Sequence, residues 1–183
     1  GGAARFEVQA RAMSDRAREN ASGKASVGRA AAGMVEDGMV VFLDSGTTTH
    51  AVTQALALAG RQNLTICTAS LPIALYACHL PNVRVHMFGG EIDPEEEAAT
   101  GIDALDPIDR FRVDIAFLGS GGLSPDGEVT DFTRLGAEQR SRMLRAAART
   151  YFVLDKTKFG KLTPLRMPGF ELATGVIVDA RPT

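Results

Sequence analysis

The feature that most constrains the fold is an alternation of short apolar runs with segments of helical periodicity. The runs are rich in valine, isoleucine and phenylalanine, as in MVVFL or TYFVLD, which is typical of strands buried on both faces. Strands that alternate with helices predict a Rossmann-like α/β fold, a mostly parallel sheet with helices on both faces. The expected strands are residues 39–43, 64–68, 83–88, 113–120, 150–155 and 175–180, and the expected helices are residues 22–35, 52–59, 70–79 and 134–149.

Composition limits the class of protein. The 183 residues are enough for one domain with a sizeable core, and the hydrophobic fraction of 45% argues against a disordered chain. No apolar run approaches the roughly 20 residues of a membrane-spanning helix, and no signal peptide opens the chain, so we expect a cytoplasmic protein. The 20 basic and 22 acidic residues give a net charge of −2, which argues against DNA binding through this chain alone. Cys67 and Cys78 have no metal-binding spacing and are expected to be free thiols.

The expected domain organisation is simple. The opening GGAARFEVQARAMSDR reads as a linker, so residues 1–21 are interpreted as a leading segment and residues 22–183 as one domain. Ser22 is a candidate cap for the first helix. The acidic stretch EIDPEEEAAT, residues 91–100, is expected to be an exposed loop, with closure over a ligand as its functional alternative.

Polar and glycine residues follow the expected strands. The first is followed by Asp44 and a run of hydroxyls, the second by Thr68 and Ser70, and later ones by glycine pairs or by Lys158. In open α/β sheets, ligands bind outside the carboxyl ends of the strands. A small, polar, anionic ligand therefore fits this rim.

The hydroxyl run Ser45-Gly46-Thr47-Thr48-Thr49 opens an expected helix. The first N–H groups of a helix lack internal partners and attract anions, while glycine lets the backbone come close to a ligand. The alternative is that Ser45 or Thr47 only caps the helix, which accounts for one hydroxyl rather than four. A carboxylate at Asp44 is suited to accept hydrogen bonds from sugar hydroxyls or to order the loop. Neither a Walker loop nor a dinucleotide fingerprint is present.

Several stretches, in order, resemble the effector-binding domain of DeoR-type transcriptional regulators. They are GGA at the start, Arg16 and Lys24, VVFLDSGTTT, TAS, FGG, VDIAFLGSGGL and VLDKTKFG. The resemblance implies a fold like that of ribose-5-phosphate isomerase, glucosamine-6-phosphate deaminase and the CoA-transferases. It also implies a sensor of phosphorylated sugars or related metabolites, most often in a repressor, that forms a homo-oligomer (dimer or tetramer). DNA would be bound only through an N-terminal winged helix-turn-helix that residues 1–183 do not include.

Two positions depart from the family pattern. The family usually has T-N-S where this chain has Thr68-Ala69-Ser70, so one side-chain amide is missing. A lysine common in the last helix is replaced by Arg140, whose guanidinium effectively never loses its proton. Both changes touch the expected pocket, so the ligand of this chain is expected to differ from those of better-known members.

The alternative function is a sugar-phosphate isomerase or deaminase. Such an enzyme needs a carboxylate base near the sugar, and Asp126, Glu128 and Asp131 in SPDGEVTD are candidates. LGSGGLSPDGEVT resembles the deaminase loop, with Glu128 where the catalytic histidine stands. The structural alternative for this segment is a solvated hairpin with the turn pair Asp126-Gly127. Arg140 also stands where a lysine could act as an acid or base. Both observations favour a protein that is not an enzyme.

No catalytic residue and no cofactor are predicted for the site. A metal is not expected either, because the histidines are scattered without an aspartate or glutamate at ligand spacing. The predicted ligand-binding residues are Asp44, Ser45, Gly46, Thr47, Thr48, Thr49, Thr68, Ser70, Gly89, Gly90, Gly119, Gly121, Gly122, Glu128, Arg140 and Lys158.

Overall fold

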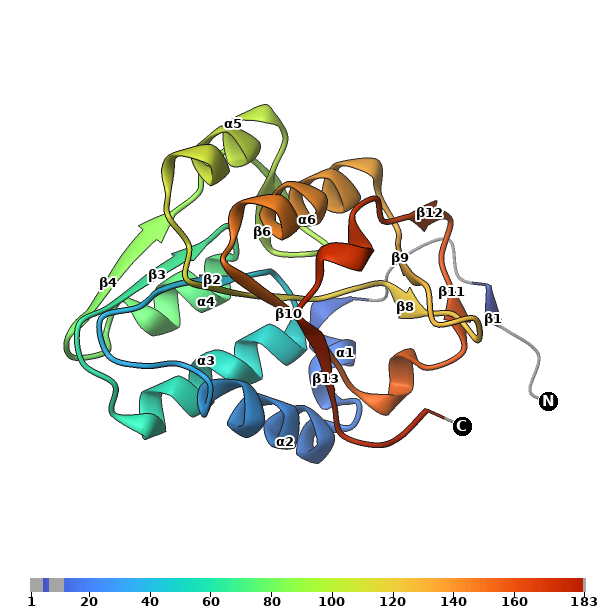
Figure 1. The fold of residues 1–183 in the computed structure, drawn as a ribbon, viewed down its shortest axis with the longest axis horizontal. Helices are drawn as coiled ribbons and strands as arrows, with labels where there is room; N and C mark the ends of the chain where they lie inside the picture. Colours follow the sequence, from blue (N-terminus) through green and yellow to red (C-terminus); the bar gives the residue numbers. More distant parts are fainter. Residues whose placement is uncertain (1–4, 7–11, 183) are drawn as a thin grey trace.

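A six-stranded parallel sheet forms the centre of the protein, in a computed structural model that describes residues 5–6 and 12–182 (Figure 1). The strand order is β13-β10-β7-β2-β3-β4, and each expected strand is confirmed with bounds that differ by a few residues at most. The opening GGA lies outside the described residues. The strands are β2 (Val40–Leu43), β3 (Leu64–Thr68), β4 (Val83–Met87), β7 (Ile115–Leu118), β10 (Arg149–Leu154) and β13 (Gly175–Val178).

Helices cover both faces of this sheet because successive strand residues point to opposite sides. On β2, Val41 and Leu43 pack with Val52 of one helical layer, whereas Phe42 packs with Met143 of the other. Figure 1 shows α2 and α3 below the sheet and α5 and α6 above it. The helices are α2 (Ala21–Ala32), α3 (Thr47–Ala59), α4 (Leu71–Ala77), α5 (Ile102–Leu105) and α6 (Arg134–Ala146), with the 3-10 turn η1 (Asp106–Arg110) after α5.

Helix α2 begins differently from the prediction. The residue before its first turn is Asn20, in the left-handed conformation at φ 50° and ψ 47°, and Ser22 lies inside the helix. The prediction of Ser22 as the cap was therefore wrong. Asparagine tolerates the left-handed region, and here the Asn20 amide donates to both Asp155 and Asp179, at 2.8 and 2.9 Å. Contacts with residues far along the chain thus set this helix start.

The acidic stretch 91–100 is a hairpin rather than a loop, so that expectation was wrong. Strand β5 (Glu91–Asp93) pairs antiparallel with β6 (Ala98–Thr100). The hairpin is tied to the connection between β3 and α4, since Ala99 N donates to Ala69 O at 2.8 Å and Leu71 N donates to Glu97 O at 2.9 Å. Local composition disfavours strands here, and these long-range hydrogen bonds override it.

Smaller strands gather at one end of the sheet, at the right of Figure 1. Strands β8 (Gly122–Leu123) and β9 (Val129–Asp131) form the hairpin expected around Asp126-Gly127, and β12 (Leu165–Arg166) extends it. Strand β1 (Arg5–Phe6) pairs with β11 (Lys161–Leu162). The other short elements are α1 (Met13–Arg18), η2 (Lys156–Lys158) and η3 (Phe170–Leu172).

The order of the strands creates a switch point. From β2 the chain runs through β3 to β4 on one side, and β7, β10 and β13 then lie on the other side. Crevices at such a reversal, outside the carboxyl ends of the strands, are where open α/β sheets bind ligands.

Among the described residues, no helix has the length and apolar character needed to cross a membrane.

Candidate functional site

A cavity of about 310 Å³ lies at this switch point, a volume suited to a small metabolite. Its walls come from the turns that follow β2, β7 and β10, together with the start of α6, helix α1 and the β5–β6 hairpin. Distant segments of the chain therefore meet at one place, as the strand-end pattern predicts.

The turn into α3 forms one wall. Gly46 is the residue before the first helical turn, at φ 135°, a conformation that favours glycine. No side chain caps this helix, and the Thr49 hydroxyl instead donates to Gly46 O at 3.0 Å. The alternative in which Ser45 or Thr47 caps α3 is therefore wrong, and the hydroxyls of Ser45, Thr47 and Thr48 belong to residues that line the cavity.

Arg140 lies at the floor of the cavity between two buried carboxylates. Its Nε donates to Asp44 Oδ2 at 2.5 Å, and its Nη1 donates to Asp131 Oδ2. Burial disfavours the charged guanidinium, but the attraction of Asp131 and Asp44 outweighs it and the pKa of Arg140 is raised. Arg140 is thus a permanent cation whose charge is already matched inside the protein.

Asp44 holds the floor together. Burial raises the pKa of Asp44, and Arg140 and the N–H of Gly119 act against that rise. Its two oxygens accept from Ser45 N at 2.8 Å and Gly119 N at 2.9 Å as well as from Arg140. Asp44 therefore orders the turns after β2 and β7, which is one of the two roles expected for it.

An ion pair joins two walls of the cavity, on a side that we call the mouth because Glu96 is more exposed than the carboxylates beside Arg140. Arg16 Nη2 on α1 donates to Glu96 Oε1 in the β5–β6 turn at 2.9 Å. Arg16, Glu96, Asp93 and Glu95 all line the cavity. The side chain of Lys24 on α2 is buried and donates to Arg16 O, which fixes the last turn of α1.

Lys158 contributes a cation on the side of β10. The pKa of Lys158 is lowered to about 8, mainly by burial and also by the positive charges of Lys161, Arg16 and Lys24, while Asp155 acts in the opposite direction. An anion close to Lys158 would favour its charged form. The lysine is thus suited to a ligand that brings negative charge.

Several polar atoms of lining residues have no hydrogen-bond partner within the described part of the chain. They are Ser120 Oγ, Gln139 Nε2 and Arg16 Nε, and each is buried. Unpaired buried polar atoms are rare in folded proteins. Because all three residues line one cavity, these atoms are available to hydrogen-bond a polar molecule there.

Of the predicted residues, the structure brings nine into the walls of the cavity. These are Ser45, Gly46, Thr47, Thr48, Thr49, Gly119, Gly121, Arg140 and Lys158. Their contact with a ligand stays a prediction.

The remaining predicted residues are placed elsewhere. Asp44 lies beneath Arg140. The Thr68 hydroxyl donates to Leu43 O at 2.7 Å, and the Ser70 hydroxyl caps α4 by accepting from Ile73 N at 3.3 Å. Neither residue is among those that line the cavity. The Thr68-Ala69-Ser70 departure from the family pattern thus falls on residues that support the fold beside the site.

The glycine pair at 89–90 follows β4, outside the lining residues, as does Gly122 on β8. A Cβ on Gly90 would lie 2.5 Å from Thr100 O, and one on Gly122 would lie 2.4 Å from Lys161 O. Close packing of backbone accounts for glycine at Gly90 and Gly122.

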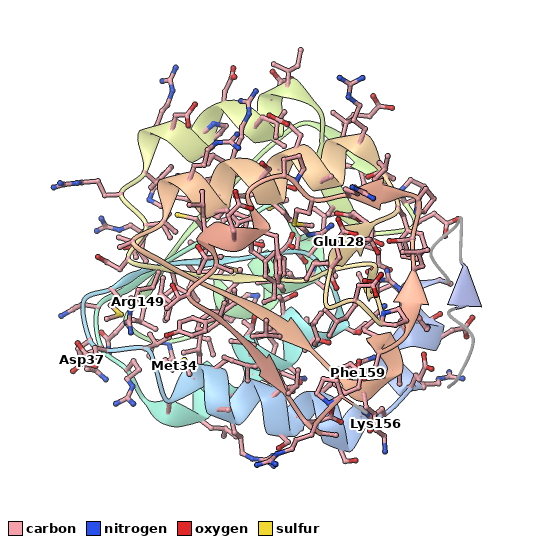
Figure 2. The ribbon with its side chains drawn as sticks, turned by 45° about the vertical axis from the view of Figure 1, so that its right-hand side comes forward. Met34, Asp37, Glu128, Arg149, Lys156 and Phe159 are labelled. Atoms are coloured by element: carbon pink, nitrogen blue, oxygen red, sulfur yellow. The ribbon has the colours of Figure 1, made fainter. Side chains whose placement is uncertain are left out.

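Glu128, labelled in Figure 2, lies in the connection between β8 and β9. Its carboxylate pairs with Arg166 of β12 at 3.6 Å. Its side chain is 41% exposed and does not line the cavity. The hairpin interpretation of SPDGEVTD is confirmed, and Glu128 lies outside the group of predicted residues that line the cavity.

Sequence reasoning missed several lining residues. Arg16 lies in the leading segment, and only its spatial neighbours reveal its position. Gln139 lies one residue before Arg140 on α6, and Ser120 stands within the glycine run after β7, so strand-end position was an available signal for Ser120.

Comparisons with known proteins agree with this geometry. Residues 19–180 match the DeoR C-terminal sensor domain family. The glycerol-3-phosphate regulon repressor of Escherichia coli strain K12 is 29% identical over 92% of this chain and 66% of its own length. The HTH-type transcriptional regulator IolR of Bacillus subtilis strain 168 is 30% identical over 81% of this chain and 58% of its own length. The chain thus spans less than two thirds of the length of these relatives.

Solved structures show the same fold. A ribose 5-phosphate isomerase from Methanocaldococcus jannaschii has a TM-score of 0.56 at 18% identity, over 79% of this chain and 56% of that protein. A probable sor operon regulator from Shigella flexneri also has a TM-score of 0.56, at 14% identity, over 87% of this chain and 86% of that protein. With most of its length matched by one sensor family, this chain belongs to the DeoR C-terminal sensor domain family.

Proposed function

We propose that this chain is the effector-sensing part of a transcriptional regulator, and that its cavity binds a phosphorylated sugar or a related anionic metabolite. Binding would alter how the full-length protein, through a helix-turn-helix domain outside these residues, binds DNA. The observation that carries the proposal is the convergence, on one cavity, of an uncapped helix start, the cations Lys158 and Arg16, and buried polar atoms without partners.

The phosphate is proposed to lie at the first turn of α3. The N–H groups of that turn and the hydroxyls of Thr47 and Thr48 supply donors, and Lys158 supplies charge. The acidic side of the cavity, with Glu95 and Glu96, suits the hydroxyls of a polyol. This division of the cavity supports a ligand with an anionic end and a hydroxylated end.

The relatives supply the regulatory part of the proposal. They include a regulon repressor and an L-fucose operon activator, and we propose a repressor that acts as a homo-oligomer. The enzyme alternative is not favoured, because both Asp131 oxygens are engaged, one by Arg140 and one by Phe132 N at 2.7 Å. A base needs a free oxygen near the substrate.

The test is a thermal-shift screen of sugar and polyol phosphates against their dephosphorylated forms. A ligand at 100 times its Kd adds about 2.7 kcal/mol, or roughly 5–10 °C in a chain of this size. Thr47→Glu should keep the melting temperature of the free protein, since a helix start favours a carboxylate, yet abolish the shift by the phosphorylated ligand.

Gln54→Glu is the matched control, because it adds the same charge to an exposed position of α3. It should leave the shift unchanged. Two outcomes would contradict the proposed phosphate position. One is an equal rise in melting temperature with phosphorylated and dephosphorylated compounds, and the other is an equal rise in Thr47→Glu and the parent with the phosphorylated ligand.

A further inference from the structure

The Arg16–Glu96 ion pair spans the mouth of the cavity and joins two segments that are far apart in the sequence. Arg16 belongs to α1, the first helix of the described chain, and Glu96 belongs to the turn of the β5–β6 hairpin. Both side chains are largely buried, 12% and 26% exposed. Arg16 Nε is also buried and, among the described residues, has no hydrogen-bond partner.

We propose that Arg16 is a ligand-binding residue that pairs with Glu96 only while the cavity is empty. An anion in the cavity replaces Glu96 as the partner of the Arg16 guanidinium. The hairpin turn then loses its contact with α1, so that ligand binding changes the surroundings of α1. The inference rests on the proposed function and adds to it a residue and a route.

The first argument is the unequal engagement of the two arginines that line the cavity. Arg140 donates to two buried carboxylates, Asp44 and Asp131, whereas Arg16 donates to one carboxylate that is partly exposed. Glu96 gives the Arg16 guanidinium one hydrogen bond, whereas a phosphate accepts a bidentate pair of bonds from a guanidinium. An incoming phosphate therefore outcompetes Glu96 for Arg16 but does not displace the carboxylates from Arg140.

The second argument is the crowding of cations around the cavity. Arg16 and Lys158 both line it, and the charge of Arg16 is one cause of the lowered pKa of Lys158. Like charges gathered at one place are stabilised by an anion between them. The acidic hairpin residue satisfies Arg16 when the cavity holds no anion.

The third argument is mechanical. The root of the hairpin is tied down by Leu71 N to Glu97 O and Ala99 N to Ala69 O, and α1 is held at its last turn by Lys24. The Arg16–Glu96 pair is the hydrogen-bonded contact in the described chain between α1 and the hairpin turn. Breaking it leaves both roots in place and releases the turn from α1, on the side of the chain where the DNA-binding domain is proposed to lie.

Calorimetry with inorganic phosphate and glycerol 3-phosphate tests the proposal on this chain. Arg16→Gln should weaken binding by about 10- to 150-fold, as expected for loss of a charge-assisted hydrogen bond, and Arg16→Lys should recover part of it. Glu96→Gln should tighten binding by about two- to fivefold, because the anion no longer competes for Arg16.

Glu95→Gln is the matched control, since Glu95 also lines the cavity and loses the same charge. Glu95→Gln should increase the affinity for the anion by less than Glu96→Gln does, and this increase should persist in an Arg16→Gln background. The increase in affinity caused by Glu96→Gln should vanish in that background. Hydrogen exchange should show faster exchange at residues 94–97 when glycerol 3-phosphate binds the parent, and no such change in Glu96→Gln. This exchange measurement does not depend on the stability of any Arg16 variant.

The outcomes separate the two proposals. If Arg16→Gln binds both probes as tightly as the parent while Lys158→Ala loses them, Arg16 is not a ligand residue and the sensing function stands. If Glu96→Gln and Glu95→Gln behave alike in both backgrounds, the reserve role of Glu96 is overturned. If neither these probes nor any sugar phosphate binds the parent, the proposed function itself fails.

Discussion

The floor and the mouth of the cavity each present an arginine, and the two are held in opposite ways. At the floor, Arg140 is locked between Asp44 and Asp131 in a buried network. At the mouth, Arg16 is paired with a single carboxylate, that of Glu96, whose side chain is 26% exposed. The difference teaches that a cation in a pocket wall is not by itself an anion site, because its charge can already be matched. Arg140 at the floor therefore shapes the cavity, whereas Arg16 at the mouth is the arginine that can bind an anion.

The largest effect is expected from breaking the floor. Arg140→Met leaves Asp44 and Asp131 buried without a counter-charge, which costs about 3–5 kcal/mol. For a chain of this size the melting temperature should fall by about 6–20 °C. Thermal unfolding with Arg142→Gln as control checks this, since the Arg142–Glu138 pair is far more exposed and its loss should cost about 0.5 kcal/mol or less. Equal losses in the two variants would refute the locked floor.

A smaller effect is expected from the pH dependence of ligand affinity, through the protonation of Lys158. Lys158, with its pKa lowered to about 8 mainly by burial, is charged below pH 8 and loses its proton as the pH rises. A bound anion raises that pKa, so binding above pH 8 takes up a proton and weakens, by about tenfold at pH 9. Below about pH 6 the phosphate loses its second charge, so affinity should peak between these values.

Calorimetry in buffers of different ionisation enthalpy measures this proton uptake directly. Lys158→Met removes the titrating group and should bind weakly with no fall between pH 8 and 9. A parent affinity that stays constant over that interval would show that Lys158 does not face the anion.

The smallest effect is expected at Glu128. Its pairing with Arg166, which is 85% exposed, contributes little. Glu128→Gln should therefore change the melting temperature by about 1–2 °C at most and ligand affinity by less than about twofold. Asp131→Asn on the same hairpin is the contrast, since it takes one carboxylate from Arg140. A marked loss of ligand affinity in Glu128→Gln would show that Glu128 contributes to the binding site after all.

The fold was largely predictable because its signals are local. Apolar runs such as Val40–Leu43 and LTICT mark buried strands, and the order of strands and helices defines the parallel sheet. The exception, the β5–β6 hairpin, is held by hydrogen bonds to residues 69 and 71 that no local pattern records. The start of α2 at Asn20 was missed for the same reason.

The site was predictable where it follows a strand. Thr47 and Gly119 were found because strand ends in a parallel sheet share one edge. That same reasoning placed Thr68 and Gly89 in the site, and the structure places both outside the cavity walls. Position at a strand end indicates which edge a residue occupies, but it does not indicate which way its side chain points.

The amino-acid sequence by itself determined the α/β class, the edge of the sheet that carries the cavity, and the hydroxyl-rich turn that opens α3. These depend on periodicity and on residues that are neighbours in the chain. Only the tertiary structure decided that Arg140 is matched by Asp44, 96 residues away, and that Arg16 reaches Glu96, 80 residues away. The energy of a charge depends on its distance to other charges and on its burial, and both are properties of the folded chain.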